Sequence, residues 1–286
     1  MRGSFPTCFE LSKQVSRPVS ADTINRFLRR TNHSYKRNKR CPALTEANKA
    51  RRVAWAKKYR DAAKRKWVFS DSKIFEGQRT GVKGEYSWCK AGESKSTTTY
   101  KYSSYRLHVY GAVSYYGNSS CHLVTGTTGL KSKYFQKNGV TKLVGVGARE
   151  YCDVLRTGGS GNGVGLIEEM DRIMRVNKVK DWVWQQDNPN VHKGVEANDF
   201  IMTKVGQKLD WPGNSPDLSP IENVWAEVER RLWEGPKWRD QAEFEVRVKA
   251  AWRSVSTDRS YMINLWKTIR VRINLLLKNN GEKLPF

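Results

Sequence analysis

The chain of 286 residues lacks a long apolar run, and its five cysteines are scattered, with none within four residues of another. Because no stretch of about 18 apolar residues occurs, we expect no membrane-spanning helix. The first residues lack the apolar core of a secretory signal, so export is not expected. The scattered cysteines exclude a zinc knuckle or a thioredoxin-like pair and favour reduced thiols in the cytosol or nucleus.

Acidic residues are also scarce, with 28 Asp and Glu against 52 Lys and Arg and a net charge of +24 at pH 7. An excess of this size favours a polyanionic partner, with nucleic acid ahead of an acidic membrane surface. Residues 1–66 carry +15 of that charge. Because each basic group near a phosphate releases a condensed counterion, this quarter of the chain is the densest candidate for phosphate contact. A solvated basic arm is the alternative.

Two basic segments in this quarter are the candidate DNA contacts. Residues 20–30 predict a short helix that is capped by Ser20 and carries an apolar stripe. The stripe consists of Ile24, Phe27 and Leu28. The side chains expected on the outer face, as in a recognition helix, are Asn25, Arg26, Arg29 and Arg30. The segment that follows is too basic and polar to pack and is typical of a linker or nuclear-targeting patch. Its expected DNA contacts are Lys36, Arg37, Lys39 and Arg40.

Residues 45–66 predict a second helix with Thr45 as its cap, and we expect Lys64-Arg65-Lys66 to touch phosphate rather than take part in chemistry. Beyond it, short apolar runs, turns and helical patterns predict a series of strands and helices. The expected strands are 67–71, 86–90, 106–116, 121–125 and 182–186, with a hairpin-type turn at 117–118. We further expect a helix at 166–176, an irregular excursion at 126–165 and helices beyond residue 212.

Two acids are expected at the ends of short, Trp-containing apolar strands. Asp71 follows one such run and Asp187 follows another, so both side chains are predicted at the rim of a sheet. Two carboxylates held close together repel each other unless a cation lies between them. Hard oxygen ligands of this type suit Mg²⁺ or Mn²⁺. The alternative is that both are ordinary turn acids.

A third acid, Glu222, lies in the first turn of a helix that is predicted to begin at Pro220. It lies beside the apolar stripe of that helix and can therefore face a site at the rim of the sheet. Equally, Ser219 and Glu222 match a capping box, which would give Glu222 a purely local role. Asp217 is the substitute candidate for the third acid.

Three segments together resemble the mariner superfamily of cut-and-paste DNA transposases. They are Phe69-Ser70-Asp71, Gln186-Asp187-Asn188 and the Trp211-Pro212…Ser215-Pro216-Asp217-Leu218-Ser219-Pro220-Ile221-Glu222-Asn223-Val224-Trp225 stretch. The last segment is long and specific. Asp187 and Glu222 are separated by 34 residues, which resembles the branch whose acid triad ends in Glu. The resemblance extends over about residues 16–235.

This resemblance implies a ribonuclease-H-like α/β core, a mixed sheet flanked by helices, with Asp71, Asp187 and Glu222 as catalytic acids that hold two Mg²⁺ or Mn²⁺ ions. It further implies cleavage of double-stranded DNA at terminal inverted repeats, strand transfer into target DNA at TA sites, a homodimer on DNA and action in the nucleus. The implied domains are a partial helix-turn-helix with basic linker at 1–42, a linker helix at 43–66, a catalytic domain at 67–235 and C-terminal helices at 236–286.

The chain departs from the family pattern in three ways. The 115 residues between Asp71 and Asp187 exceed the usual number, which predicts an insertion at about 127–165. Of two expected helix-turn-helix units only the tail of the second is represented, at about residues 15–31, so a truncated or domesticated DNA-binding protein without catalysis is the main alternative. The loop after Asp187 lacks a further acid, and its His192 could contact a phosphate or cap the next helix. A general ribonuclease H or repair nuclease ranks last, because it does not need the loop before Glu222.

Overall fold

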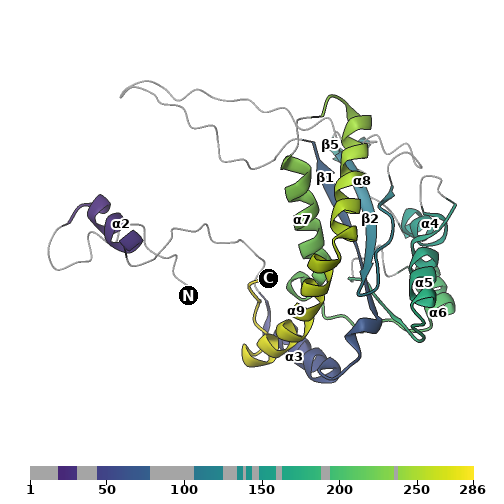
Figure 1. Cartoon of the computed structure of the whole chain (residues 1–286), viewed down its shortest axis with the longest axis horizontal. Helices are drawn as coiled ribbons and strands as arrows, with labels where there is room; N and C mark the ends of the chain where they lie inside the picture. The colour runs from purple at the N-terminus through teal and green to yellow at the C-terminus, as the bar shows by residue number, and fades with distance from the viewer. Residues whose placement is uncertain are drawn as a thin grey trace. The chain divides into compact units, whose positions relative to one another are not determined.

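A computed structural model describes residues 19–30, 44–77, 106–124, 134–137, 140–143, 148–158, 163–187, 194–234 and 238–286 (Figure 1). The chain forms two units, Met1–Ala43 and Leu44–Phe286. The predicted strand at 86–90, the basic patch at 36–40 and His192 lie outside the described residues.

The first unit contains the predicted short helix, α2 (Ala21–Arg30). As predicted, Ser20 caps it, because the Ser20 hydroxyl accepts a hydrogen bond of 3.1 Å from the backbone N–H of Thr23. The side chains of Asn25, Arg26 and Arg30 are exposed, as expected for the outer face. Phe27 of the expected apolar stripe is nevertheless 61% exposed.

The second unit is built on a four-stranded sheet in the order β3-β2-β1-β6. Its strands are β1 (Trp67–Glu76), β2 (Arg106–Ser114), β3 (His122–Leu123) and β6 (Val183–Gln185). β1 runs antiparallel to β2 and parallel to β6, so the sheet is mixed, as predicted. β1 continues well past its predicted end because its ladder with β2 extends to the Glu76–Arg106 pair. Asp71 therefore lies within the strand and not at its end, which corrects the expectation.

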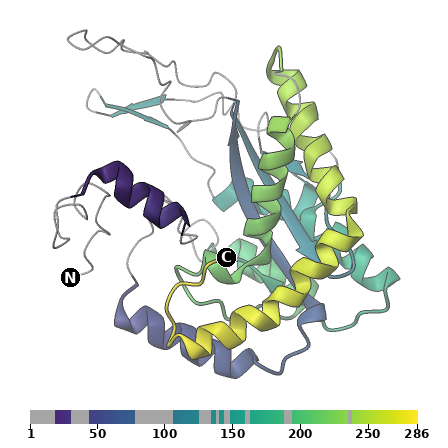
Figure 2. The ribbon, with the colours of Figure 1, turned by 60° about the vertical axis from the view of Figure 1, so that its left-hand side comes forward.

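Helices cover both faces of this sheet (Figures 1 and 2). On one face lie α7 (Pro220–Glu234), α8 (Gln241–Thr257) and α9 (Arg259–Lys278), and α3 (Glu46–Tyr59) packs along α9. On the other face lie α4 (Ala148–Thr157), α5 (Leu166–Val176) and α6 (Val195–Val205). α5 matches the predicted helix at 166–176, and α7 begins at Pro220 as predicted. No helix among the described residues is long and apolar enough to cross a membrane.

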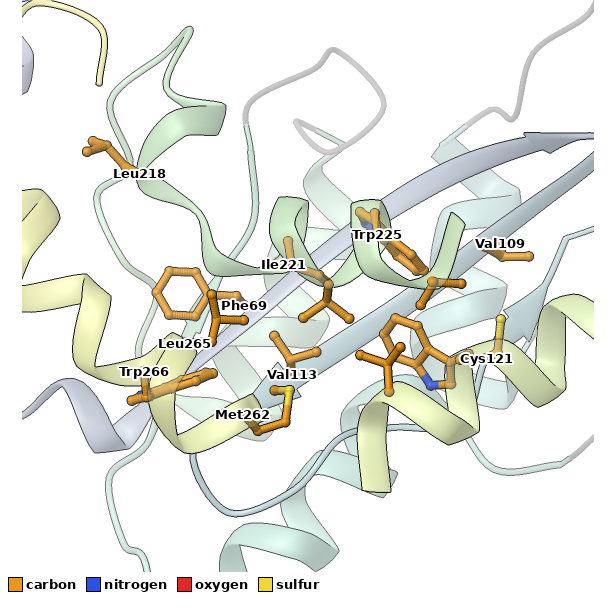
Figure 3. Close-up of a cluster of buried hydrophobic side chains, with 14 of the residues drawn as sticks. Phe69, Val109, Val113, Cys121, Leu218, Ile221, Trp225, Met262, Leu265 and Trp266 are labelled. Carbon is orange, nitrogen blue, oxygen red and sulfur yellow. The ribbon is translucent and has the colours of Figure 1, made fainter. Parts of the chain in front are cut away.

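Alternation along β1 divides its side chains between two cores. Phe69 joins the core beneath α7 and α9, whereas the neighbouring Val68 joins the core beneath α4 to α6. Figure 3 shows Phe69 beside Ile221 of α7 and Trp266 of α9, and the rings of Phe69 and Trp266 lie 5.7 Å apart. Asp71 and Phe75 share the Phe69 side of β1, so β1 presents Asp71 toward α7.

Two expectations about local structure are wrong. The predicted helix at 45–66 is capped by Thr45 as expected, but it ends at Tyr59 and is followed by a separate 3-10 turn, η1 (Lys64–Lys66). The predicted irregular excursion at 126–165 contains a hairpin of β4 (Tyr134–Lys137) and β5 (Val140–Leu143) and also helix α4. The buried residues of α4 include Tyr151, Val154 and Leu155, whose i, i+3, i+4 spacing is the signal of an amphipathic helix.

Candidate active site

The three acids singled out in the sequence lie on three different elements and line one cavity of about 420 Å³. Asp71 lies in the middle of β1, Asp187 lies two residues beyond β6, and Glu222 lies in the first turn of α7. Because β1 and β6 are parallel neighbours, the strand end that carries Asp187 comes beside the middle of β1. The loop 211–219 forms the remaining wall of the cavity.

The cavity concentrates negative charge. Burial, together with the nearby charges of Glu222 and Asp187, raises the pKa of Asp71 to about 8. Partial burial and the charge of Asp187 also raise the pKa of Glu222, although Lys73 opposes this shift. The ionised acids therefore destabilise one another, and a cation placed among them would relieve the repulsion.

One neutral hydrogen bond orients the most buried of these acids. The indole N–H of Trp225 donates to Asp71 Oδ2 over 3.1 Å. Trp225 lies one helical turn after Glu222, so α7 supplies both an acid and a donor to the cavity. The Trp225 ring is fixed by the ring of Trp252 from α8, with centroids 4.7 Å apart. Gly111, the cross-strand neighbour of Asp71, leaves the room that these two rings occupy.

The donor set of the cavity fits a hard divalent cation. Its acids offer carboxylate oxygens, and two further residues of the lining, Gln185 and Ser219, each carry a buried oxygen without a hydrogen-bond partner. Such oxygens suit Mg²⁺ or Mn²⁺. Among the described residues, however, no three His, Cys, Asp or Glu side chains are close enough to hold an ion as they stand. The lack of a partner on Ser219 Oγ also means that the capping box with Glu222 is not formed.

Asp217, the substitute candidate, has a different environment. Its carboxylate faces the guanidinium of Arg52 from α3, with an Nη1–Oδ1 distance of 2.8 Å and an Nη2–Oδ2 distance of 2.6 Å. The backbone N–H of Leu284 donates to the same Oδ2 over 2.8 Å. Burial alone would raise the pKa of Asp217, but these hydrogen bonds lower it. Asp217 therefore anchors the loop before α7 and does not line the cavity.

A second buried arginine holds the same loop. Arg272 of α9 donates through Nη1 to the carbonyl of Asp217 over 2.9 Å and through Nη2 to Asn223 Oδ1 over 2.6 Å. Burial lowers the pKa of Arg272 to about 10. Neither arginine was predicted from the sequence as part of the site. The burial of Arg52 could have been predicted from the sequence, because Arg52 shares one face of α3 with the apolar Trp55 and Ala56 at i+3 and i+4.

The strand end that carries Asp187 is anchored from the opposite layer. Tyr151 of α4 donates its hydroxyl to Gln186 Oε1 over 2.5 Å, and the indole N–H of Trp184 lies 3.3 Å from the same oxygen. Ser70 of β1 donates to the carbonyl of Gln185 over 2.7 Å. The position of Asp187 is thus fixed by contacts from β1 and α4. The predicted DNA contacts on α2 belong to the other unit.

Comparisons with known proteins agree with this architecture. The chain is 30% identical over 242 residues to the transposable element Tcb1 transposase of Caenorhabditis briggsae, an alignment that covers 82% of this chain and 78% of that protein. It is 25% identical over 223 residues to the Tcb2 transposase of the same organism, over 74% of this chain and 70% of that protein. No family model matches the chain.

Solved structures show the same fold. The Mos1 mariner paired end complex with Mn superimposes with a TM-score of 0.67 at 15% identity, over 97% of this chain and 75% of that chain. The catalytic domain of Mos1 mariner transposase superimposes with a TM-score of 0.57 at 12% identity, over 86% of this chain and 100% of that domain. The α/β unit therefore has the predicted ribonuclease-H-like fold. Because of its sequence identity to the Tcb1 transposase, the chain belongs to the Tc1/mariner family of transposases.

Proposed function

We propose that the chain is a metal-dependent DNA transposase in which Asp71, Asp187 and Glu222 are the catalytic acids. The observation that carries the proposal is the convergence of these acids, from three separate elements, on one cavity. The proposed reaction is cut-and-paste transposition, with cleavage of DNA at the element ends and transfer of the ends into target DNA at TA sites. The proposed site of action is the nucleus, with a homodimer holding two ends.

The three acids would hold two Mg²⁺ or Mn²⁺ ions. When bound, such ions activate a water or a 3′-hydroxyl and stabilise the leaving 3′-oxygen in an in-line displacement. Asp71 must lose its proton to act as a ligand, which the approach of a divalent charge favours. Trp225 orients Asp71 through its hydrogen bond to Oδ2. Arg52 and Arg272 fix the loop before α7, and this loop positions Glu222 at the cavity.

Support for a divalent ion and for DNA comes from the chemistry of the chain and from its relatives. The lining offers only hard oxygen donors around the acids, and the net charge of +24 suits a polyanion. One structural neighbour is described as a Mos1 paired end complex with Mn and another as a Mos1 strand transfer complex. The second candidate, a transposase-derived DNA-binding protein without catalysis, is favoured by the charge of +15 on residues 1–66, which needs no catalytic site.

The test is nicking of plasmid DNA with Mn²⁺ or Mg²⁺ by the wild type, by Asp187→Asn and by Asp199→Asn as a control. Asp199 is an exposed acid on α6 and does not line the cavity. We expect nicking to be lost in Asp187→Asn and retained in Asp199→Asn, with DNA binding nearly intact in both. If the Asp187→Asn variant nicked DNA as well as the wild type, Asp187 would not be a catalytic acid. Tight, salt-sensitive binding without any metal-dependent nicking would favour the non-catalytic candidate.

A further inference from the structure

Helix α9 carries one strongly basic face. Its 20 residues, Arg259–Lys278, contain no Asp or Glu. At about 100° per residue the exposed Arg259, Lys267, Arg270 and Lys278 project within about 100° of one another. The buried residues of α9 occupy the opposite side. Along the axis, Arg259 and Arg270 are about 16 Å apart, which is the rise of about five base pairs of duplex DNA.

The 3-10 turn η1 extends this face. The indole N–H of Trp266 donates to the carbonyl of Lys64 over 3.2 Å, which fixes η1 against α9. Two guanidinium groups lie over the Tyr115 ring, with Arg65 4.5 Å and Arg259 5.0 Å from its centroid. We call the surface formed by Lys64, Arg65, Arg259, Lys267, Arg270 and Lys278 the α9–η1 face. Stacking on Tyr115 holds two of its cations in place before any partner binds.

Within the described part of the chain, no acid lies at ion-pair distance from the cations of the α9–η1 face. None of its six basic side chains has a described Asp or Glu within 4.0 Å of its charged nitrogen atoms. On α7 and α8, by contrast, some cations are paired with acids one helical turn away. Arg230 pairs with Glu227, and Lys249 pairs with Glu245. The α9–η1 face thus presents a row of cations that no described acid within 4.0 Å neutralises.

Two of these cations also act on each other. Burial and the charge of Arg270 lower the pKa of Lys64, against the opposing effect of Asp61. Holding two like charges close together costs free energy, and an anion that contacts both recovers it. A row of such cations along a helix matches the regular spacing of phosphates along a nucleic acid strand.

We propose that the α9–η1 face binds the phosphate backbone of a DNA duplex. It is a DNA-binding surface on the unit that carries the three acids, separate from the basic segment at residues 26–40. Lysine and arginine contacts to phosphate position a duplex and carry no sequence information, so the face holds DNA of any sequence. The choice of DNA as the polyanion rests on the proposed function.

The test compares two triple variants of the full chain that lose the same charge. The first is Lys267→Ala, Arg270→Ala, Lys278→Ala, in which alanine preserves the helix. The control is Lys180→Ala, Lys204→Ala, Lys208→Ala, which removes three exposed cations near α5 and α6. Among the described residues none of these three has an acid within 4.0 Å either. Binding of a labelled duplex is measured across a salt series without divalent metal, so cleavage does not contribute, and melting curves check folding.

We expect the α9 variant to bind DNA about 10- to 100-fold more weakly at low salt and to lose about 2 to 3 units from the salt slope of log K. At about 0.1 M salt, where the Debye length is about 10 Å and distant exposed charges are screened, the control should lose less than about threefold. Equal losses in both variants would assign the effect to net charge and overturn the proposal, as would unchanged binding by the α9 variant. Binding of anionic vesicles that depends on the α9 cations, with DNA binding unchanged, would assign the face to a membrane instead. The catalytic proposal is tested separately by nicking, so either can fail alone.

Discussion

Arg52 and Asp217 form a buried ion pair across 165 residues of sequence, with both carboxylate oxygens bonded to the guanidinium. The same guanidinium donates to Ser215 Oγ over 2.8 Å and to the carbonyl of Gly281 over 2.9 Å. Three separate parts of the unit therefore meet at one charge: helix α3, the loop before α7 and the C-terminal segment. Because that loop lines the acid cavity, the ion pair connects helix α3 to the wall of the cavity.

Removal of one partner of this pair should strongly destabilise the unit. Arg52→Met leaves the Asp217 carboxylate buried without its counter-charge, and we expect the free energy of unfolding to fall by about 3–5 kcal/mol. Urea denaturation measures it. Arg52→Met combined with Asp217→Leu should recover much of the loss, because a buried pair can be replaced by apolar packing. Lys58→Ala, which breaks an exposed pair with Asp210, should have little effect. If Arg52→Met lowered the free energy of unfolding only slightly, the pair would not be what holds α3, the loop before α7 and the C-terminal segment together.

The same pair predicts how stability depends on pH. The pKa of Asp217 is lower in the folded chain than in the unfolded chain, so its contribution is complete above the ordinary carboxyl pKa and is lost as pH falls through the lowered folded-state value. We expect the difference in unfolding free energy between the wild type and Asp217→Asn to shrink as pH falls from 7 to 3. Denaturation at a series of pH values measures it. A difference that stays constant over this range would contradict the lowered pKa.

Features set by neighbouring residues were predictable from the sequence, and features set by distant ones were not. The caps Ser20 and Thr45 and the start of α7 at Pro220 depend on local backbone chemistry, and all three are confirmed. By contrast, the place of Asp71 inside β1 is set by a ladder with β2, which begins 30 residues beyond the end of β1. The burial of Arg52 likewise depends on a carboxylate far along the chain. The three acids were found because they stand in motifs. Ser70, Gln186 and Trp225, which help to hold them, stand in the same motifs, whereas Arg52, Tyr151 and Arg272 do not.

Gly111 should not tolerate a side chain, because a Cβ at this position would lie 2.5 Å from Trp252 Cη2 and 3.1 Å from Trp225 Cη2. Both rings are fully packed, so neither can move away freely. We expect Gly111→Ala to lower the free energy of unfolding by about 1–3 kcal/mol. Gly213→Ala is the matched control, since its Cβ would meet nothing within 4 Å. Equal stability of the two variants would mean that the Trp225–Trp252 pair is loosely packed.

Trp225→Phe should weaken metal binding without unfolding the chain. The substitution keeps an aromatic ring against Trp252 but removes the N–H that donates to Asp71 Oδ2, so the carboxylate loses its fixed orientation and a hydrogen bond that favours its ionised form. Loss of such a supporting bond typically costs about tenfold or more in metal affinity. Titration of Mn²⁺ followed by electron paramagnetic resonance measures the free ion directly and does not depend on activity.

Trp252→Phe is the matched control for this experiment. It removes an indole N–H from the same ring pair, but that N–H donates to the backbone carbonyl of Ser119 over 2.8 Å and not to an acid. Any general loosening of the pair should therefore appear in both variants, whereas weaker Mn²⁺ binding should appear only in Trp225→Phe. If the two variants bind Mn²⁺ equally well, the hydrogen bond to Asp71 does not prepare the carboxylate for an ion, and Trp225 acts only in the core.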